Sequence, residues 1–213
     1  MRKKLTISLF LIVIHFSSAV FAADKEKENI IDLTPWKGNN VSNIKLYDSE
    51  AGERFFEEVM EYAPKGYTKK MVKDFFYNMF SLKFKSLSVV DENTIIIDNK
   101  ITGDYVHVGS LSTKAGKHDI TWHIFKTDSK EMSQAGFKYF LFLPFHGHGK
   151  GSFRHAHLRY GNENFDFLVT DPSVQSWWPA VYQPTETDEA KVMAQMTKIA
   201  KLQATMLPPL KRQ

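Results

Sequence analysis

Three histidines lie close together in the segment FHGHGKGSFRHAHLRYGN. They are His146, His155 and His157, and the last two are two residues apart. The HAHLRY stretch is predicted to be a β-strand, on which residues i and i+2 point to the same face. Two imidazoles on one face, with a third nine residues upstream across a Gly-rich connection, could build a metal site. Neutral imidazole suits zinc, copper, nickel and iron, and a zinc ion with three His ligands keeps a fourth position open.

The i, i+2 pair alone is also compatible with half-exposed strand residues whose rings are hydrogen-bonded to neighbours. His146 and His148 in the adjacent turn favour the metal interpretation, because half of the chain's eight histidines then fall within one short segment. A His-rich loop can equally be polar and solvated. His148 is a further candidate ligand, whereas His107 and His123 lie in predicted strands and are interpreted as structural histidines.

The elements that must position these histidines are predicted from hydrophobic periodicity. Apolar residues at helical spacing predict helices over residues 49–63, 68–80 and 187–203. The candidate caps are Asp48 or Ser49 for the first helix and Thr185 or Thr187 for the last. From Lys83 onward the period changes to two, which predicts strands. These are Lys83–Val90, Thr94–Asp98, Tyr105–Leu111, Asp119–Lys126, Tyr139–Phe145 and His155–Tyr160, with Asp166–Thr170 as a further candidate.

Short consecutive strands separated by turn residues favour an antiparallel sheet or barrel. The expected class is therefore mainly β with added α-helices. Residues 36–207 are long enough for one well-buried domain, and the polar, charged residues 23–35 are expected to be a flexible lead-in.

Residues 1–22 have the pattern of a secretory signal peptide. A basic start precedes an apolar run and a small-residue region, which predicts cleavage after Ala22. An uncleaved anchor is the alternative, but the apolar run of about 12 residues is shorter than the ~20 that a spanning helix needs. No second long apolar run follows, so we expect no membrane segment after the leader.

The composition excludes several function classes. Losing Arg2, Lys3 and Lys4 with the leader lowers the formal net charge from +4 to +1, and no dense Lys/Arg stripe supports nucleic-acid binding. The sequence has no cysteine, so a transition-metal site must use His and carboxylate ligands. No G-x-S-x-G, HExxH or phosphate-binding Gly loop occurs, and the acidic residues form no paired arrangement typical of a glycosidase.

The segment KYFLFLPFHGHGKGSFRHAHLRYGN resembles the metal-binding segment of the ZinT (YodA) family of periplasmic zinc proteins. The family's spacing of nine and then two residues is matched at His146, His155 and His157. The similarity covers about residues 30–203 and is most specific after residue 100. Its supporting motifs are Trp36-Lys37-Gly38, Lys114-Ala115-Gly116-Lys117 and Trp178-Pro179 followed by Tyr182.

The resemblance implies a lipocalin-like (calycin) antiparallel β-barrel with added helices. It also implies periplasmic zinc binding through the three histidines, with water, a small anion or another ligand in the fourth position. The implied role is zinc supply under scarcity, with the binding protein of a zinc ABC importer as the partner. Two family features are missing here, because no His-rich segment follows the leader and no Cys pair occurs.

The leading hypothesis is a periplasmic zinc chaperone or scavenger that is not an enzyme. One alternative is a zinc hydrolase or hydratase, since an open position on zinc lowers the pKa of bound water to about 7. The other is a lipocalin-like carrier whose Phe and Trp residues line the cup. Cadmium, nickel and copper are also expected to bind, because imidazole ligands discriminate poorly among these metals.

Overall fold

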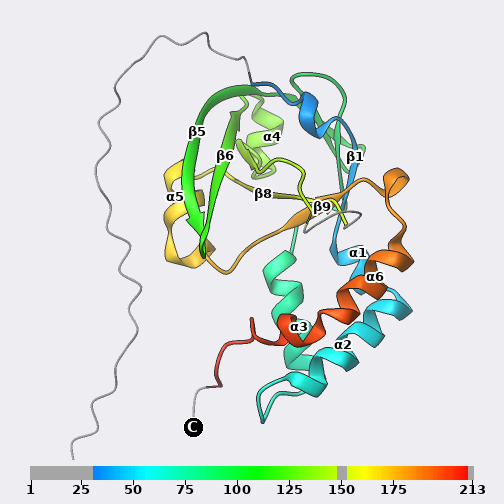
Figure 1. Ribbon diagram of the computed structural model, residues 1–213. Helices are drawn as coiled ribbons and strands as arrows, with labels where there is room; N and C mark the ends of the chain where they lie inside the picture. The colour runs from blue at the N-terminus through cyan, green and yellow to red at the C-terminus, as the bar shows by residue number, and fades with distance from the viewer. Residues whose placement is uncertain (1–30, 148–152, 211–213) are drawn as a thin grey trace, which may run out of the picture. The chain divides into compact units, whose positions relative to one another are not determined.

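Nine antiparallel strands form one curled sheet in the computed structural model, which describes residues 31–147 and 153–210 (Figure 1). The strands are β1 Gly38–Ser42, β2 Ser86–Val89, β3 Thr94–Ile97, β4 Ile101–Asp104, β5 Val106–Ala115, β6 His118–Lys126, β7 Tyr139–Phe142, β8 Ala156–Gly161 and β9 Ala180–Tyr182. Their order is β4-β3-β2-β1-β9-β8-β7-β6-β5, so all neighbours except β1 and β9 are consecutive in the chain. The predicted mainly β, lipocalin-like architecture is confirmed, as a half-barrel.

The concave face of the sheet holds the largest core. Alternate residues of the strands point into it, as the period-two pattern predicts, and the face is filled mainly by aromatic and branched side chains. Phe140 lies at its centre, fully buried, with its ring centroid 5.5 Å from that of Tyr105 and 5.6 Å from that of Phe142. The cup that a carrier would need is therefore packed with side chains.

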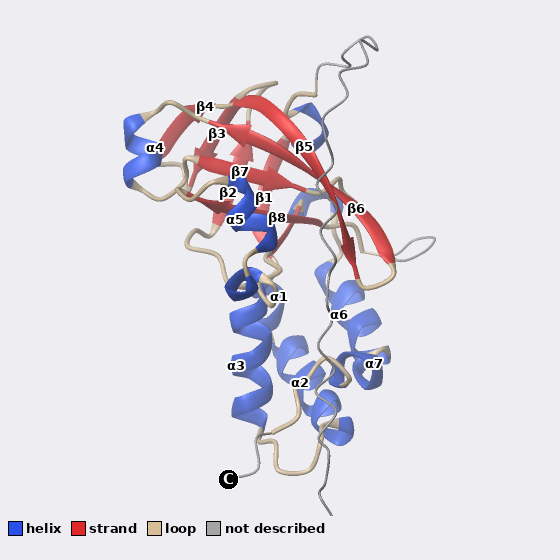
Figure 2. Ribbon diagram, turned by 90° about the vertical axis from the view of Figure 1, so that its left-hand side faces the viewer, coloured by secondary structure: helices blue, strands red, loops and turns tan. Residues whose placement is uncertain are grey.

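The α-helices are α1 Ile44–Tyr47, α2 Glu50–Tyr62, α3 Lys69–Phe80, α4 Lys130–Gln134, α5 Phe165–Thr170, α6 Glu189–Lys198 and α7 Ala200–Ala204, with short 3-10 helices η1 Thr34–Trp36, η2 Pro172–Val174 and η3 Pro184–Glu186. Helices α1, α2, α3, α6 and α7 form a separate layer beside the sheet, whereas α4 and α5 lie against the strands (Figure 2). A second core joins α1, α2, α3, α6 and α7 around Tyr47, which is 2% exposed. A Cβ atom at Gly52 would collide with the Tyr47 carbonyl, so glycine is required where α2 meets α1.

The first two predicted helices are confirmed, and Ser49 is the cap of the first. The Ser49 side chain accepts a hydrogen bond from the Gly52 N–H, and the Thr68 side chain accepts one from the Met71 N–H. Their apolar stripes are the buried faces of α2 and α3.

Two predicted elements are wrong. Residues 166–170 form part of helix α5 and not a strand, because the Asn164 side chain caps a helical turn there. The single helix expected over residues 187–203 is two helices, because Ile199 leaves the helical conformation with φ −104° and ψ 15°. Its cap is Asp188, whose side chain accepts from the Lys191 N–H, and not Thr185 or Thr187.

The end of the expected lead-in is packed against the sheet. Leu33 is fully buried in the concave core and η1 follows it directly, so the last residues of the expected lead-in 23–35 pack against the sheet. Among residues 31–147 and 153–210, no helix combines the length and the apolar character needed to cross a membrane.

Candidate metal centre

An antiparallel bridge brings two of the predicted ligands face to face. The N–H of His146 donates to the carbonyl of His155, and the N–H of His155 donates back to the carbonyl of His146, each at 3.0 Å. Directly opposite residues of an antiparallel pair point to the same face of the sheet. His157 follows His155 by two positions along β8 and shares that face as well.

The histidines lie on the outer face of the sheet, not in the cup. The intervening residues Ala156 and Leu158 point into the concave core. His155, His157 and Arg159 therefore face the other side, between α5 and the helical layer. This position follows from the register of the strand, because a shift by one residue would have placed the imidazoles inside the packed core.

The three imidazoles are close enough to share one metal ion. One ligand atom from each residue can be chosen so that all three lie within 4.8 Å of one another. Ring centroids are 4.5 Å apart for His146 and His155, 5.5 Å for His146 and His157, and 5.0 Å for His155 and His157. A tetrahedral zinc ion with Zn–N bonds of ~2.0–2.1 Å holds two nitrogens about 3.3 Å apart. Small rotations of the three side chains would therefore bring their nitrogens to the spacing that a zinc ion needs.

Backbone carbonyls select which nitrogen of two rings can coordinate. Nδ1 of His146 lies 3.0 Å from the Pro144 carbonyl oxygen. Nδ1 of His157 lies 3.2 Å from the Trp178 carbonyl oxygen and 3.3 Å from that of Pro179. A carbonyl only accepts hydrogen bonds, so Nδ1 must carry the proton in each ring, and Nε2 is the nitrogen suited to a metal.

Aromatic rings surround the group. Phe153 stacks on His155 with centroids 5.2 Å apart and an interplanar angle of 18°. Trp178 meets His157 edge-on at 5.6 Å. His155 is 8% exposed while His146 and His157 are half-buried, so a bound ion would be reachable from solvent on one side.

Arg159 is a neighbour of the site that the sequence analysis missed. Its guanidinium lies 5.2 Å from the ring centre of Trp122 and 5.0 Å from that of Trp178, beside a pair of indoles whose ring centres are 6.0 Å apart. Burial lowers the pKa of Arg159 to about 10, so it remains a cation at neutral pH. The sequence did offer one indication of its position. Arg159 follows His157 by two residues on the same strand and so shares its face.

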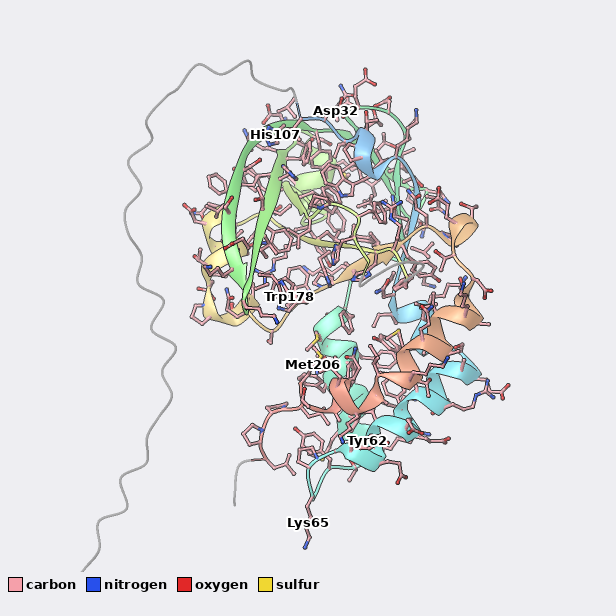
Figure 3. All side chains as sticks on the ribbon, viewed as in Figure 1. Asp32, Tyr62, Lys65, His107, Trp178 and Met206 are labelled. Carbon is pink, nitrogen blue, oxygen red and sulfur yellow. The ribbon has the colours of Figure 1, made fainter. Side chains whose placement is uncertain are left out.

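The other histidines are not brought to this group. His107 and His123 are hydrogen-bonded to the Ser110 hydroxyl at 3.1 and 3.0 Å, and burial lowers the pKa of each. Figure 3 shows His107 at one end of the sheet and Trp178 at the other, beside the helices. His148 lies outside the described residues.

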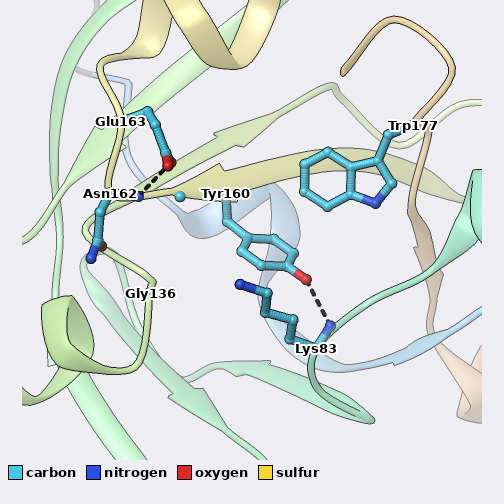
Figure 4. A pocket seen from close by; sticks show the side chains of 7 residues that line it. Lys83, Gly136, Tyr160, Asn162, Glu163 and Trp177 are labelled. Carbon is cyan, nitrogen blue, oxygen red and sulfur yellow. Dashed lines mark hydrogen bonds between the residues drawn. The ribbon is translucent and has the colours of Figure 1, made fainter. Parts of the chain in front are cut away.

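A surface hollow of the described residues lies away from the three histidines. One hollow of about 210 Å³ is lined by Lys83, Tyr160, Trp177 and their neighbours (Figure 4). The Tyr160 hydroxyl accepts a hydrogen bond from the Lys83 backbone N–H at 2.7 Å, which anchors this wall. None of the three clustered histidines lines this hollow.

Comparison with solved structures finds the same fold in zinc-bound proteins. The Zn(II)-bound ZinT-like domain of Streptococcus pneumoniae AdcA superposes with a TM-score of 0.57 at 16% identity, over 81% of this chain and 94% of that one. Zn(II)-bound AdcA from the same organism gives a TM-score of 0.57 at 18% identity, over 83% of this chain.

The chain spans only part of the second of these proteins, 40% of its length. No family model matches the chain, and no curated protein sequence matches it either. At these identities the likeness establishes the fold, and the chemistry depends on the residues of the site.

Proposed function

We propose that the chain is a ZinT-family zinc-binding protein that works as an exported, periplasmic metal chaperone or scavenger. It binds one zinc ion through His146, His155 and His157, and it releases that ion to the binding protein of a zinc ABC importer. The open fourth position holds water or a small anion, which suits exchange of the metal better than a closed four-ligand site does.

The observation that carries the proposal is the convergence of the three imidazoles. Their ligand atoms lie within 4.8 Å on one face of the sheet, and Nδ1 of two of the rings is hydrogen-bonded to backbone carbonyls. Carbonyl acceptors on the non-coordinating nitrogen are typical of protein metal sites, because they fix the ring orientation and raise ligand basicity. The fold likeness to two Zn(II)-bound structures supports the same assignment.

The packing of the sheet opposes the carrier alternative. The concave face that would hold an apolar ligand is occupied by Phe140, Phe142 and Trp36, all nearly or fully buried. A ligand of drug-like size needs a cavity of ~300 Å³ or more, and side chains fill that space here.

We expect zinc affinity to fall steeply below the ordinary imidazole pKa of ~6.5, because protonated imidazole cannot coordinate a metal. With three imidazole ligands, up to three protons compete with each zinc ion, so lowering the pH from 7.5 to 5 should weaken affinity by more than about 100-fold. The measurement is a competition titration against a chromophoric chelator at each pH. Circular dichroism at the same pH values controls for unfolding, and a pH-independent affinity would contradict histidine ligation.

The physiological role is tested by deleting the gene in its native host. Growth of the deletion strain should slow only when zinc is chelated, and added zinc should restore it. The background must lack redundant zinc importers, which would otherwise hide the defect. Complementation by the wild-type gene, but not by a His155→Ala/His157→Ala gene, connects the defect to the site. Equal growth of deletion and parent strains across the chelator series would argue for another role.

A further inference from the structure

Arg159 is a buried charged residue, and buried charges in proteins are usually paired with an opposite charge. It is 1% exposed, and among the described residues no carboxylate forms an ion pair with it. Its Nη1 donates to the carbonyls of Leu168 and Val169 at 2.8 and 3.1 Å. These carbonyls belong to the last turn of α5, where the negative end of the helix dipole favours a cation.

Trp178 connects this cation to the metal site. Its indole lies on one side of the Arg159 guanidinium, and its ring edge meets His157. Its backbone carbonyl is one of the two that hold Nδ1 of His157, and its N–H donates to the Met79 carbonyl of α3 at 2.7 Å. The position of Trp178 therefore sets the position of the carbonyl that orients the third ligand.

We propose that Arg159 is a positioning residue for the metal site. It holds Trp178 between the guanidinium and His157, so that the Trp178 carbonyl keeps His157 in the Nδ1–H tautomer with Nε2 directed at the other two imidazoles. This inference rests on the proposed zinc site, and it adds the group that aligns one of its ligands.

Packing alone accounts poorly for an arginine here. An apolar residue such as methionine would fill the space beside Trp122 and Trp178 without desolvating a charge, and such replacements are often neutral or stabilising. Residues that depart from the usual preferences for a buried position, as this arginine does, are often retained because they serve function. The guanidinium lies close to both indoles and donates to the α5 carbonyls at the same time, whereas methionine has no donor and lysine has no planar group.

The test compares Arg159→Met and Arg159→Lys with wild type, and it uses Lys138→Met as the matched control. Lys138 makes a cation–π contact with Tyr139 in the same sheet, 5.6 Å from the ring centre and outside the metal site. The first readout is the tautomer of His157 in metal-free protein, from long-range nitrogen–proton NMR above the imidazole titration range. The second is zinc affinity by chelator competition.

We expect a mixed His157 tautomer in Arg159→Met and a loss of zinc affinity of about 10–100-fold, the range for removing a second-shell partner. Arg159→Lys should recover part of the single tautomer and part of the zinc affinity, and Lys138→Met should change neither the tautomer nor the affinity.

An unchanged tautomer in a folded Arg159→Met protein would overturn the proposal, even if its melting temperature falls. If Arg159→Met does not fold, an unchanged tautomer and unchanged affinity in Arg159→Lys would overturn it as well. The tautomer is read without metal, so failure of the wild-type protein to bind zinc would overturn the proposed function without deciding the role of Arg159.

Discussion

Replacing His155 and His157 together by alanine should abolish high-affinity zinc binding while the fold is retained. The double substitution leaves a single imidazole, His146, of the three that converge within 4.8 Å. Loss of a second-shell partner alone costs ~10–100-fold in metal affinity, so loss of two direct ligands should cost more than ~100-fold. Titration calorimetry should show a stoichiometry of one zinc per chain for wild type and no measurable high-affinity binding for the variant.

The matched control is His107→Ala/His123→Ala. It also removes two strand histidines, but these are hydrogen-bonded to Ser110 and do not belong to the cluster. This control should bind zinc with the wild-type stoichiometry and affinity. Unchanged zinc stoichiometry in the His155→Ala/His157→Ala protein would refute the three-His site, and loss of binding in the control would place the metal elsewhere.

The histidine cluster could be predicted from sequence because its geometry is local. A period of two puts His155 and His157 on one strand face, and the chain returns nine residues after His146 so that His146 lies opposite His155. Which side of the sheet they face is not local information. It depends on how β7, β8 and β9 align, and the choice of the outer face became visible only with the three-dimensional core.

The surroundings of the site could not be predicted for a related reason. The carbonyl that holds His157 comes from Trp178, 21 residues away in the sequence, and Trp178 is placed by contacts with α3 and Arg159. The sequence analysis also missed the short strands β1 and β9, for the same reason that distant residues decide their structure. They have five and three residues, and they are stabilised by pairing with distant partners, not by a long alternating pattern.

The fold should not depend on the metal, since three cores of apolar side chains stabilise the sheet and the helices without any ligand. Phe140→Ala should therefore lower the free energy of unfolding by about 3–5 kcal/mol, the usual cost of truncating a fully buried phenylalanine. That is a large share of the ~5–15 kcal/mol that stabilises a typical domain. Urea unfolding of chelator-treated protein, followed by circular dichroism, measures the change without any contribution from zinc.

Val106→Ala is the control for this variant, because Val106 is 63% exposed and such surface changes stay within about 0.5 kcal/mol. Phe140→Ala should still bind one zinc ion, whereas His155→Ala/His157→Ala should lose zinc binding and remain folded without metal. Added zinc should raise stability only by mass action, about 2.7 kcal/mol at a free concentration 100 times the Kd. A metal-free wild-type protein that is unfolded at pH 7 would show instead that the histidine site is part of what holds the sheet together.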